Sequence, residues 1–420
     1  MKEEYLHYIF RTKQLGENFT TTKNLNVEIL NFGLFNTNSG PDFLECKIKL
    51  NGKIWAGQIE FHVKSSDWIK HKHQNDPNYN NVILHMVFEH DLEITSGQYE
   101  LPVVELKNVI SQSHYLKYKT YMNSKNWIAC QNDIQSVDDF IIFQQKEKAL
   151  LNRLSRKSKS IINLFEHYNG DRKKVFYIVL FKAFGTKVNQ QAFKKLGENF
   201  DHKVIAKLNY DLVKIQAYLF GISGFLTEKN EDKYFLNLQK EYAYQKQLYS
   251  LTEMNIKEWK FSTMRPSNFP TVRIAQISQL LSNNLKVNEN QTMTELIQIF
   301  KTKTDDYWER YYMFGRVGKR KNKGLSLDFI NLILINVVIP YLFAIGCATD
   351  DEKLKEKTFD WLEQIKPEKN ALLNKWKKMD IEIKTVADSQ ALIELKNEFC
   401  SKHKCLNCKI GQYLLKFKGH

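Results

Sequence analysis

The dipeptide Asn51-Gly52 lies between two segments in which apolar and polar residues alternate, Leu44–Leu50 and Ile54–Val63. Asn and Gly tolerate the positive φ angles of a primed two-residue turn, and alternation is typical of half-buried strands. A third segment, Asn81–Glu89, is apolar enough to form a buried strand. These features predict a β-hairpin within a larger sheet.

The flanking patterns predict a compact mixed-sheet α/β module over residues 1–127. Lys2–Gln14 has apolar residues at roughly helical spacing, and Leu25–Phe32 alternates as a strand does. Ser65–Tyr79 predicts a short helix that begins at a serine cap and ends before Pro77. Tyr99–Leu106 predicts a last strand, which Pro102 restricts to an edge.

The apolar spacing becomes mostly helical after Trp127. We expect a basic helical region over residues 128–263, a second helical region over 264–399, and a Cys-rich tail over 400–420 packed on the body. Leu327–Ile345 is the most apolar segment, and because it contains Asp328 and Asn331 it predicts a buried core helix before a membrane span. The predicted fold class is therefore α+β.

The positive charge of this chain is unevenly distributed. The net charge is +15, but the residues through Ser136 carry 14 Lys and Arg against 15 Asp and Glu, a net of −1. The remainder carries 48 against 32, a net of +16. A basic excess favours binding to nucleic acid or another polyanion, although Lys-rich helix surfaces have the same composition. The charged first segment lacks the apolar centre of a signal peptide, so we expect a cytoplasmic protein without membrane association.

Asp42 is expected at the start of one hairpin strand and Glu60 in its partner, where a twisted hairpin can bring the two carboxylates together. Converging carboxylates suit Mg²⁺ or Mn²⁺. Glu60, His62 and Lys64 have the same parity and share one face of the strand. His62 or Lys64 would then assist the water that attacks a phosphodiester.

This pattern resembles the PD-(D/E)XK, restriction-endonuclease-like nuclease superfamily. Its signature is Pro-Asp, a gap, then an acid, any residue and Lys, on a helix–three-strand–helix–strand frame. Pro41-Asp42 and Glu60 match the signature, whereas His62 stands where the family has Lys. The resemblance implies metal ligation by Asp42 and Glu60. In some members it implies a further acid from the first helix, for which Glu3, Glu4 and Glu17 are candidates.

The polar segment after the hairpin resembles the mismatch-repair endonucleases of that superfamily, which use histidines near the metal. The resemblance implies a role beside the substrate for four residues: Asp67, Trp68, His71 and His73.

Two other interpretations use the same residues. In one, the hairpin is an ordinary surface hairpin whose Asp42 caps a turn and whose histidines are solvated. In the other, histidines bind a transition metal. The set would be His62, His71, His73 and His85.

Four stretches along the chain resemble an uncharacterised bacterial domain-of-unknown-function family over essentially the full length. They are GPDF, GQIEFHVKSSDWIKHKH, RPSNFPTVRIAQ and CLNCKIGQYLL. The resemblance implies that these stretches belong to one unit, and it implies no activity.

The C-terminal segment carries Cys400, His403, Cys405 and Cys408. Clustered cysteines in a chain without a secretory signal favour metal binding over disulfides. Three thiolates and an imidazole predict a structural Zn²⁺ site. The alternatives are an iron–sulfur cluster, with Cys130 or Cys347 as a remote fourth ligand, and three free thiols.

We expect a metal-dependent phosphodiesterase that acts on DNA or RNA, with basic residues binding the phosphate backbone. The alternative is a non-catalytic nucleic-acid-binding or scaffold protein that keeps a nuclease-like fold. The candidate phosphate contacts lie in the sequence GRVGKRKNKG and are Arg316, Lys319, Arg320 and Lys321.

Overall fold

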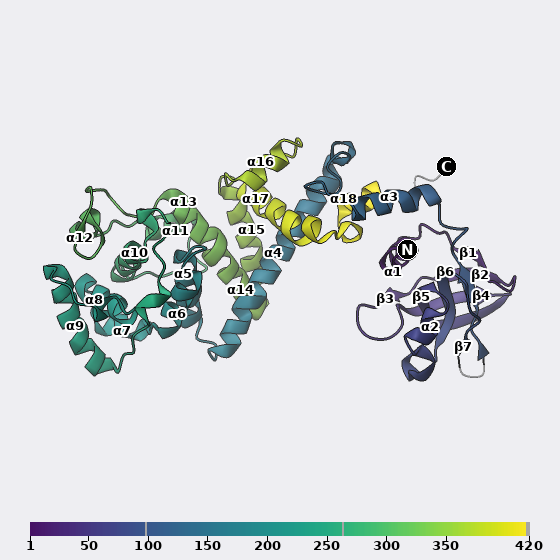
Figure 1. Ribbon diagram of the computed structural model, residues 1–420, viewed down its shortest axis with the longest axis horizontal. Helices are drawn as coiled ribbons and strands as arrows, with labels where there is room; N and C mark the ends of the chain where they lie inside the picture. Colours follow the sequence, from purple (N-terminus) through teal and green to yellow (C-terminus); the bar gives the residue numbers. More distant parts are fainter. Residues whose placement is uncertain (97–98, 263, 417–420) are drawn as a thin grey trace. The chain divides into compact units, whose positions relative to one another are not determined.

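The structure is a computed structural model that describes residues 1–96, 99–262 and 264–416. The chain forms two compact units (Figure 1). Unit 1 comprises Met1–Glu147 and Leu395–His420, and unit 2 comprises Lys148–Glu394. The expected boundary at residue 127 lies shortly before this division, and the expected boundary at 263 lies inside unit 2. Residues 417–420 of the predicted tail are outside the described residues.

Unit 1 is built on a curled mixed sheet with strand order β1-β2-β4-β5-β6-β9, and β3 pairs with β4. The strands are β1 (Asn18–Thr20), β2 (Asn26–Asn31), β3 (Leu34–Phe35), β4 (Phe43–Leu50), β5 (Lys53–Lys64), β6 (Val82–Glu89) and β9 (Val103–Glu105). The pairs β2–β4 and β4–β5 are antiparallel, whereas β5–β6 and β6–β9 are parallel. A separate small ribbon joins β7 (Thr95–Ser96) and β8 (Tyr99–Glu100).

The predicted hairpin is confirmed. Asn51 has φ 44° and Gly52 has φ 85°, so both turn residues have the positive φ of a type I′ turn. Leu50 pairs with Lys53 directly across the turn. The register shifts between Phe43 and Cys46, where Glu45 has φ 57°. A bulge therefore lies near the first residue of β4, close to Asp42.

Helix α1 (Glu3–Arg11) lies within the predicted helical segment and packs its apolar face on the sheet. Phe10 is fully buried, and its ring centroid lies 4.8 Å from that of Phe43 and 5.0 Å from that of Phe61. Aromatic pairs at these separations add to the free energy of burial. The helix is thereby fixed against the two strands that carry Asp42 and Glu60.

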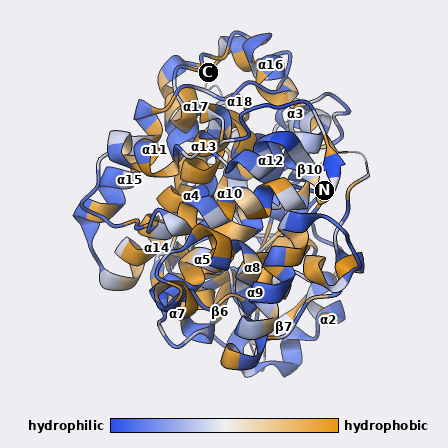
Figure 2. Ribbon diagram, turned by 90° about the vertical axis from the view of Figure 1, so that its left-hand side faces the viewer, coloured by the Kyte–Doolittle hydropathy of each residue, from blue (hydrophilic) through white to orange (hydrophobic). Residues whose placement is uncertain are grey.

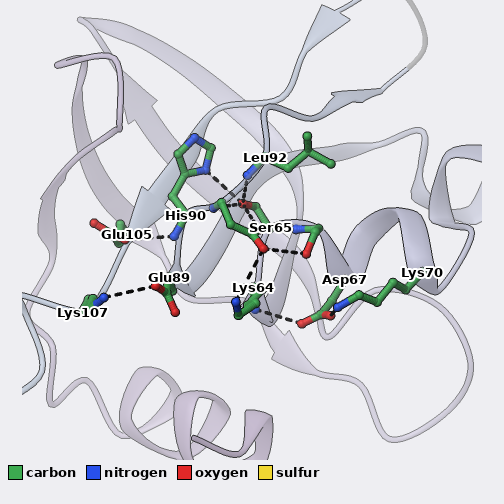
Figure 3. Close-up of polar contacts among 11 residues, drawn as sticks. Lys64, Ser65, Asp67, Lys70, Glu89, His90, Leu92, Glu105 and Lys107 are labelled. Carbon is green, nitrogen blue, oxygen red and sulfur yellow. Dashed lines mark hydrogen bonds and ion pairs between the residues drawn. The ribbon is translucent and has the colours of Figure 1, made fainter.

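The parallel pair β5–β6 requires a crossover, which contains α2 (Asp67–Lys70) and two 3₁₀ turns, η1 (His73–Asn75) and η2 (Pro77–Tyr79). Ser66 is the residue before α2, but its side chain makes no capping hydrogen bond. Ser65 instead accepts hydrogen bonds from the backbone N–H groups of Asp91 and Leu92 at 2.9 and 3.1 Å (Figure 3). The crossover is therefore tied to the end of β6.

The chain returns to unit 1 after unit 2, and its tail packs on elements formed much earlier in the sequence. Unit 1 also contains α3 (Gln112–Met122), η3 (Ile134–Ser136) and the first part of α4 (Asp139–His167). The tail contains a π-helical turn, η8 (Leu395–Phe399), two 3₁₀ turns, η9 (Cys400–Lys402) and η10 (Cys405–Asn407), and α18 (Lys409–Leu414). Arg11 on α1 donates to the Leu406 carbonyl at 3.2 Å, and α18 lies beside α3 (Figure 1). His114 on α3 also hydrogen-bonds the Leu415 carbonyl.

Unit 2 is almost entirely helical, as predicted. It contains the rest of α4, then α5 (Arg172–Phe184), α6 (Gln190–Asn199), α7 (His202–Lys207), α8 (Leu212–Ile222), η4 (Phe225–Thr227), α9 (Lys233–Tyr249), η5 (Ile256–Glu258), η6 (Pro266–Asn268), α10 (Pro270–Ser282), α11 (Met293–Phe300), α12 (Asp306–Arg310), β10 (Tyr311–Met313), β11 (Arg316–Val317), α13 (Leu327–Ile333), η7 (Leu334–Val338), α14 (Ile339–Thr349), α15 (Glu352–Gln364), α16 (Ala371–Lys377) and α17 (Val386–Glu394).

The helical stretch Leu327–Thr349 is long and apolar enough to cross a membrane, but 83% of its most apolar window is buried inside the protein. This burial agrees with the predicted buried core helix. Figure 2 shows hydrophobic and hydrophilic residues alternating around many of the helices, as expected where one face of each helix packs on a core.

Gly57 provides a test of the sheet packing. A Cβ atom there would lie 2.5 Å from the Asn81 carbonyl oxygen and 2.5 Å from Ile83 Cγ2. We expect Gly57→Ala to lower the free energy of unfolding by about 1–3 kcal/mol, as overpacking does. Ala56→Ser, at the neighbouring exposed position, should change it by less than about 0.5 kcal/mol. Urea denaturation of both variants checks this, and equal stabilities would contradict it.

Candidate functional site

Asp42 and Glu60 lie together, each held by a backbone N–H of the other strand. The Asp42 N–H donates to Glu60 Oε2 at 3.0 Å, and the Phe61 N–H donates to Asp42 Oδ2 at 2.9 Å. Two reciprocal hydrogen bonds fix both carboxylates to the hairpin. The expected convergence of the two acids is therefore present in the geometry.

Glu60 is buried, with 5% of its surface exposed. Burial raises the pKa of its carboxyl well above the usual range, and the charge of Asp42 raises it further. The charge of Asp42 therefore disfavours a charge on Glu60 unless a compensating partner is present. A proton on Glu60 or a bound cation can fill that role.

Three imidazoles surround the same carboxylate. Among the residues that the structure describes, one group of potential metal ligands has every donor atom within 4.8 Å of the others, and it consists of His62, His71 and His73. Glu60 Oε1 lies 3.6 Å from His62 Nε2 and 3.5 Å from His73 Nε2, and His62 Nε2 lies 3.1 Å from His71 Nδ1. The three imidazoles therefore form one group of donor atoms, and Glu60 Oε1 lies beside two of them.

These separations match those of ligands on one ion. Two ligands each about 2.1 Å from a metal lie about 3.0 Å apart at a right angle and about 3.4 Å apart at the tetrahedral angle. The observed distances of 3.1, 3.5 and 3.6 Å lie in or just beyond this interval. The donor set fits a divalent transition metal better than Mg²⁺, which prefers oxygen ligands.

His62 is the central imidazole of the site. Burial and the neighbouring imidazoles lower the pKa of His62 to about 2, so the ring is neutral near pH 7 and can present a lone pair. Its other nitrogen, Nδ1, lies 2.8 Å from Nε2 of the fully buried His85. Metal-binding histidines commonly use their second nitrogen in this way, and it fixes the tautomer. His85 is thus placed to orient His62.

Trp68 was expected beside the substrate, but it is fully buried and has no surface for one. Its ring centroid lies 5.4 Å from that of His73, 5.4 Å from that of His85 and 5.8 Å from that of Tyr79. Trp68 therefore supports the histidines from inside the protein. The stacked pair of His73 and Tyr79, with centroids 3.8 Å apart, holds the His73 ring in the same way.

Lys64 and Asp67 belong to a different polar cluster (Figure 3). The Lys64 N–H donates to Asp67 Oδ2 at 2.9 Å, and the Lys64 ammonium lies 3.9 Å from Asp91 Oδ2. Asp67 Oδ1 also accepts a hydrogen bond from the Lys70 ammonium at 2.6 Å. These contacts organise the turn into α2, and the half-exposed Lys64 ammonium lies near Asp91.

Helix α1 contributes two residues that complete the site. His7 Nε2 lies 3.1 Å from Asp42 Oδ2, a contact that sequence reasoning missed. Burial and the charge of Asp42 raise the pKa of Glu3, which places Glu3 beside the carboxylates, whereas Glu4 is exposed. Glu3 and His7 are four residues apart and therefore lie on one helix face. This spacing is the feature of the sequence that could have linked the two residues.

The basic residues of unit 2 differ in whether their side chains already make hydrogen bonds or ion pairs within the unit. On α4, Arg156 donates to both carboxylate oxygens of Glu394 at 3.1 and 2.6 Å, and Lys157 donates to Asn336 Oδ1 at 2.6 Å. Beside them a hollow of about 780 Å³ is lined by these two residues and by Lys182, Lys187 and Lys194, among others.

The predicted loop cluster is exposed at Arg316, Lys319, Arg320 and Lys321. Arg320 nevertheless pairs with Glu309 at 3.0 Å and with Asp306 at 3.1 Å. Lys323 of the same stretch is buried and donates to backbone carbonyls at 2.6 to 3.0 Å, so it is structural.

In the tail, Cys400, Cys405 and Cys408 line one cavity together with Cys130. His403 is exposed and is not among the lining residues, and Cys347 is exposed in unit 2. Of the two cysteines named as remote candidates, Cys130 lies beside the tail cysteines and Cys347 is not among the lining residues.

Comparison with known proteins gives one match. The family described as "Protein of unknown function (DUF2851)" matches residues 3–371. The chain belongs to this family. A search of curated proteins and a search of solved structures each returned no match.

The histidine group leads to a prediction about metal binding. We expect Mn²⁺ or Zn²⁺ to raise the melting temperature, because a ligand at 100 times its Kd stabilises the folded state by about 2.7 kcal/mol. His73→Ala should lose most of this increase because it removes one ligand. His90→Ala, outside the group, should keep it. Differential scanning fluorimetry with a metal titration checks the prediction, and equal increases in both variants would contradict it.

Proposed function

We propose that this chain is a metal-dependent phosphodiesterase acting on nucleic acid, with its site at the hairpin of unit 1. The observation that carries the proposal is the meeting of Asp42 and Glu60 with three imidazoles. Acids held by reciprocal backbone hydrogen bonds are pre-organised, which is what catalysis by positioned charge requires.

The sheet topology supports the proposal. Helix α1 precedes β2, β4 and β5, which pair antiparallel in order, and α2 connects β5 to the parallel strand β6. This arrangement resembles the helix–three-strand–helix–strand frame of restriction-endonuclease-like nucleases. Asp42, immediately before β4, and Glu60 in β5 would correspond to the acids of that superfamily. Because the resemblance is one of fold, the function rests on the site itself.

Each residue then has a defined role. Glu60, His62, His71 and His73 would hold a divalent cation, with Asp42 beside Glu60 as the second acid. Such a cation activates water and neutralises charge on the phosphate. His85 orients His62, and His7 positions Asp42. Mn²⁺ and Zn²⁺ suit this mixed donor set better than Mg²⁺ does.

The charge distribution supports a polyanionic substrate. The segment after Ser136 has a net charge of +16, whereas the segment that bears the acids has −1. Attraction of phosphate groups would come from the exposed loop around Arg316 and from the hollow with Lys182 and Lys187. We also propose a cytoplasmic location, where a reducing environment would keep the cysteines of the chain as free thiols.

A nuclease assay tests the proposal. Asp42→Asn and Glu60→Gln should each reduce cleavage of DNA or RNA in Mn²⁺ by at least about 100-fold, the usual range for a positioned electrostatic group. Glu28→Gln, at a half-buried position in β2 whose carboxylate lies 4.0 Å from the Lys49 ammonium, is the matched control and should retain activity. Circular dichroism should show that all three variants fold.

The outcome separates the enzyme from the alternative. Binding to nucleic acid without cleavage by the wild-type protein, under every metal, would support a non-catalytic binding or scaffold protein. Cleavage that survives in both acid variants would remove the hairpin from the active site.

Salt dependence tests the phosphate contacts. Neutralising Arg316, Lys319 and Lys321 together should flatten the slope of log affinity against log salt by about two to three, because each contact on duplex DNA contributes about 0.9. Arg320→Gln alone should have a smaller effect, since its guanidinium already pairs with Glu309 and Asp306. Fluorescence anisotropy over a salt series measures both slopes. A wild-type slope in the triple variant would exclude the loop from the interface.

A further inference from the structure

The strongest feature outside the hairpin site is a set of four cysteines that line one cavity in unit 1. Cys130 lies between α3 and η3, and Cys400, Cys405 and Cys408 come from the tail, more than 250 residues later. All four are free of disulfides. The cavity walls also include Tyr121, Phe399 and Gly411, and its lining is mainly apolar.

The tail backbone is shaped closely around this cavity. Cys400 follows the π-helical turn η8, Cys405 opens η10, and Cys408 immediately precedes α18. Gly411 packs so closely that a Cβ atom would lie 2.2 Å from the Cys405 carbonyl oxygen. The absence of a side chain at Gly411 therefore lets α18 approach the cysteine loop.

The separation of the sulfurs distinguishes between kinds of metal site. Four thiolates on one Zn²⁺, with Zn–S near 2.3 Å, lie about 3.8 Å from one another. In the part of the chain that the structure describes, the only group of three ligand atoms with every pair within 4.8 Å is the histidine group. No three of these thiols therefore lie within 4.8 Å of one another, which disfavours a single zinc ion held by them.

We propose that Cys130, Cys400, Cys405 and Cys408 hold an iron–sulfur cluster. The tail thiols are separated by four and by two residues, a spacing used by iron–sulfur proteins whose fourth cysteine lies elsewhere in the chain. Four cysteine ligands complete such a cluster, so the site is structural and has no open position for a substrate. This proposal stands apart from the hairpin site and from its activity.

The cluster would join the point where the chain leaves unit 1 to the point where it returns. A cross-link over so long a separation restricts the unfolded chain strongly, and metal binding is coupled to folding. It would add to the hydrogen bonds that Arg11 and His114 already make to the tail.

Analysis of the full chain, purified without oxygen, tests the proposal. We expect a brown protein with iron and acid-labile sulfide in equal amounts, about two or about four of each per chain, and visible absorption that bleaches on reduction. Cys130→Ser should lose most of the iron. Two variants should retain it: Cys347→Ser, the exposed-cysteine control, and His403→Ala, which removes a ligand that only a three-cysteine, one-histidine zinc site would need.

Other results would overturn the proposal. These are about one zinc and no iron per wild-type chain, metal that is lost in His403→Ala but kept in Cys130→Ser, or no cluster even after reconstitution with iron and sulfide. The wild-type measurements decide the question even if the cysteine variants do not fold. Because metal content and colour are read without a substrate, failure here is distinguishable from failure of the proposed nuclease activity.

Discussion

Two hydrogen bonds across the hairpin hold the two acids of unit 1 in place. The Asp42 N–H reaches Glu60, and the Phe61 N–H reaches Asp42. Because of these hydrogen bonds, the register of β4 against β5 determines where the two carboxylates lie. Two features of the surrounding structure fix that register. The turn at Asn51 and Gly52 sets it, and the aromatic contacts of α1 hold both strands.

The local features of this unit could be predicted because they depend on short-range physics. The turn dipeptide, the alternation in β4 and β5, and the shared parity of Glu60 and His62 each follow from one or two residues. The role of Trp68 could not be predicted, because its burial depends on β6 and on Tyr79. Its indole is amphipathic, and only tertiary packing decides whether such a ring faces solvent or core.

The same limit applies to long-range partners. The spacing of Glu3 and His7 places them on one helix face, but it does not show that His7 contacts Asp42, and nothing near Cys130 in the sequence selects it over Cys347 as the neighbour of the tail cysteines. The contacts of His7 and Cys130 come from helix packing and from the return of the chain after unit 2.

The charge available for binding also depends on tertiary contacts. Composition marked α4 as basic, yet Arg156 and Lys157 are engaged with Glu394 and Asn336, so a count of lysines and arginines overstates the charge available to a ligand.

Unit 1 is discontinuous, and this has a consequence for its biosynthesis. The segment through Glu147 emerges from the ribosome first, but α18 and the cysteine loop follow only after Lys148–Glu394 has been made. At about 5–20 residues per second, the early segment waits roughly 12 to 50 seconds for the residues that close it. During that interval Arg11 and His114 lack their tail partners. The completed unit therefore exists only on chains whose helical unit has already been synthesised, so a chain interrupted within unit 2 cannot assemble it.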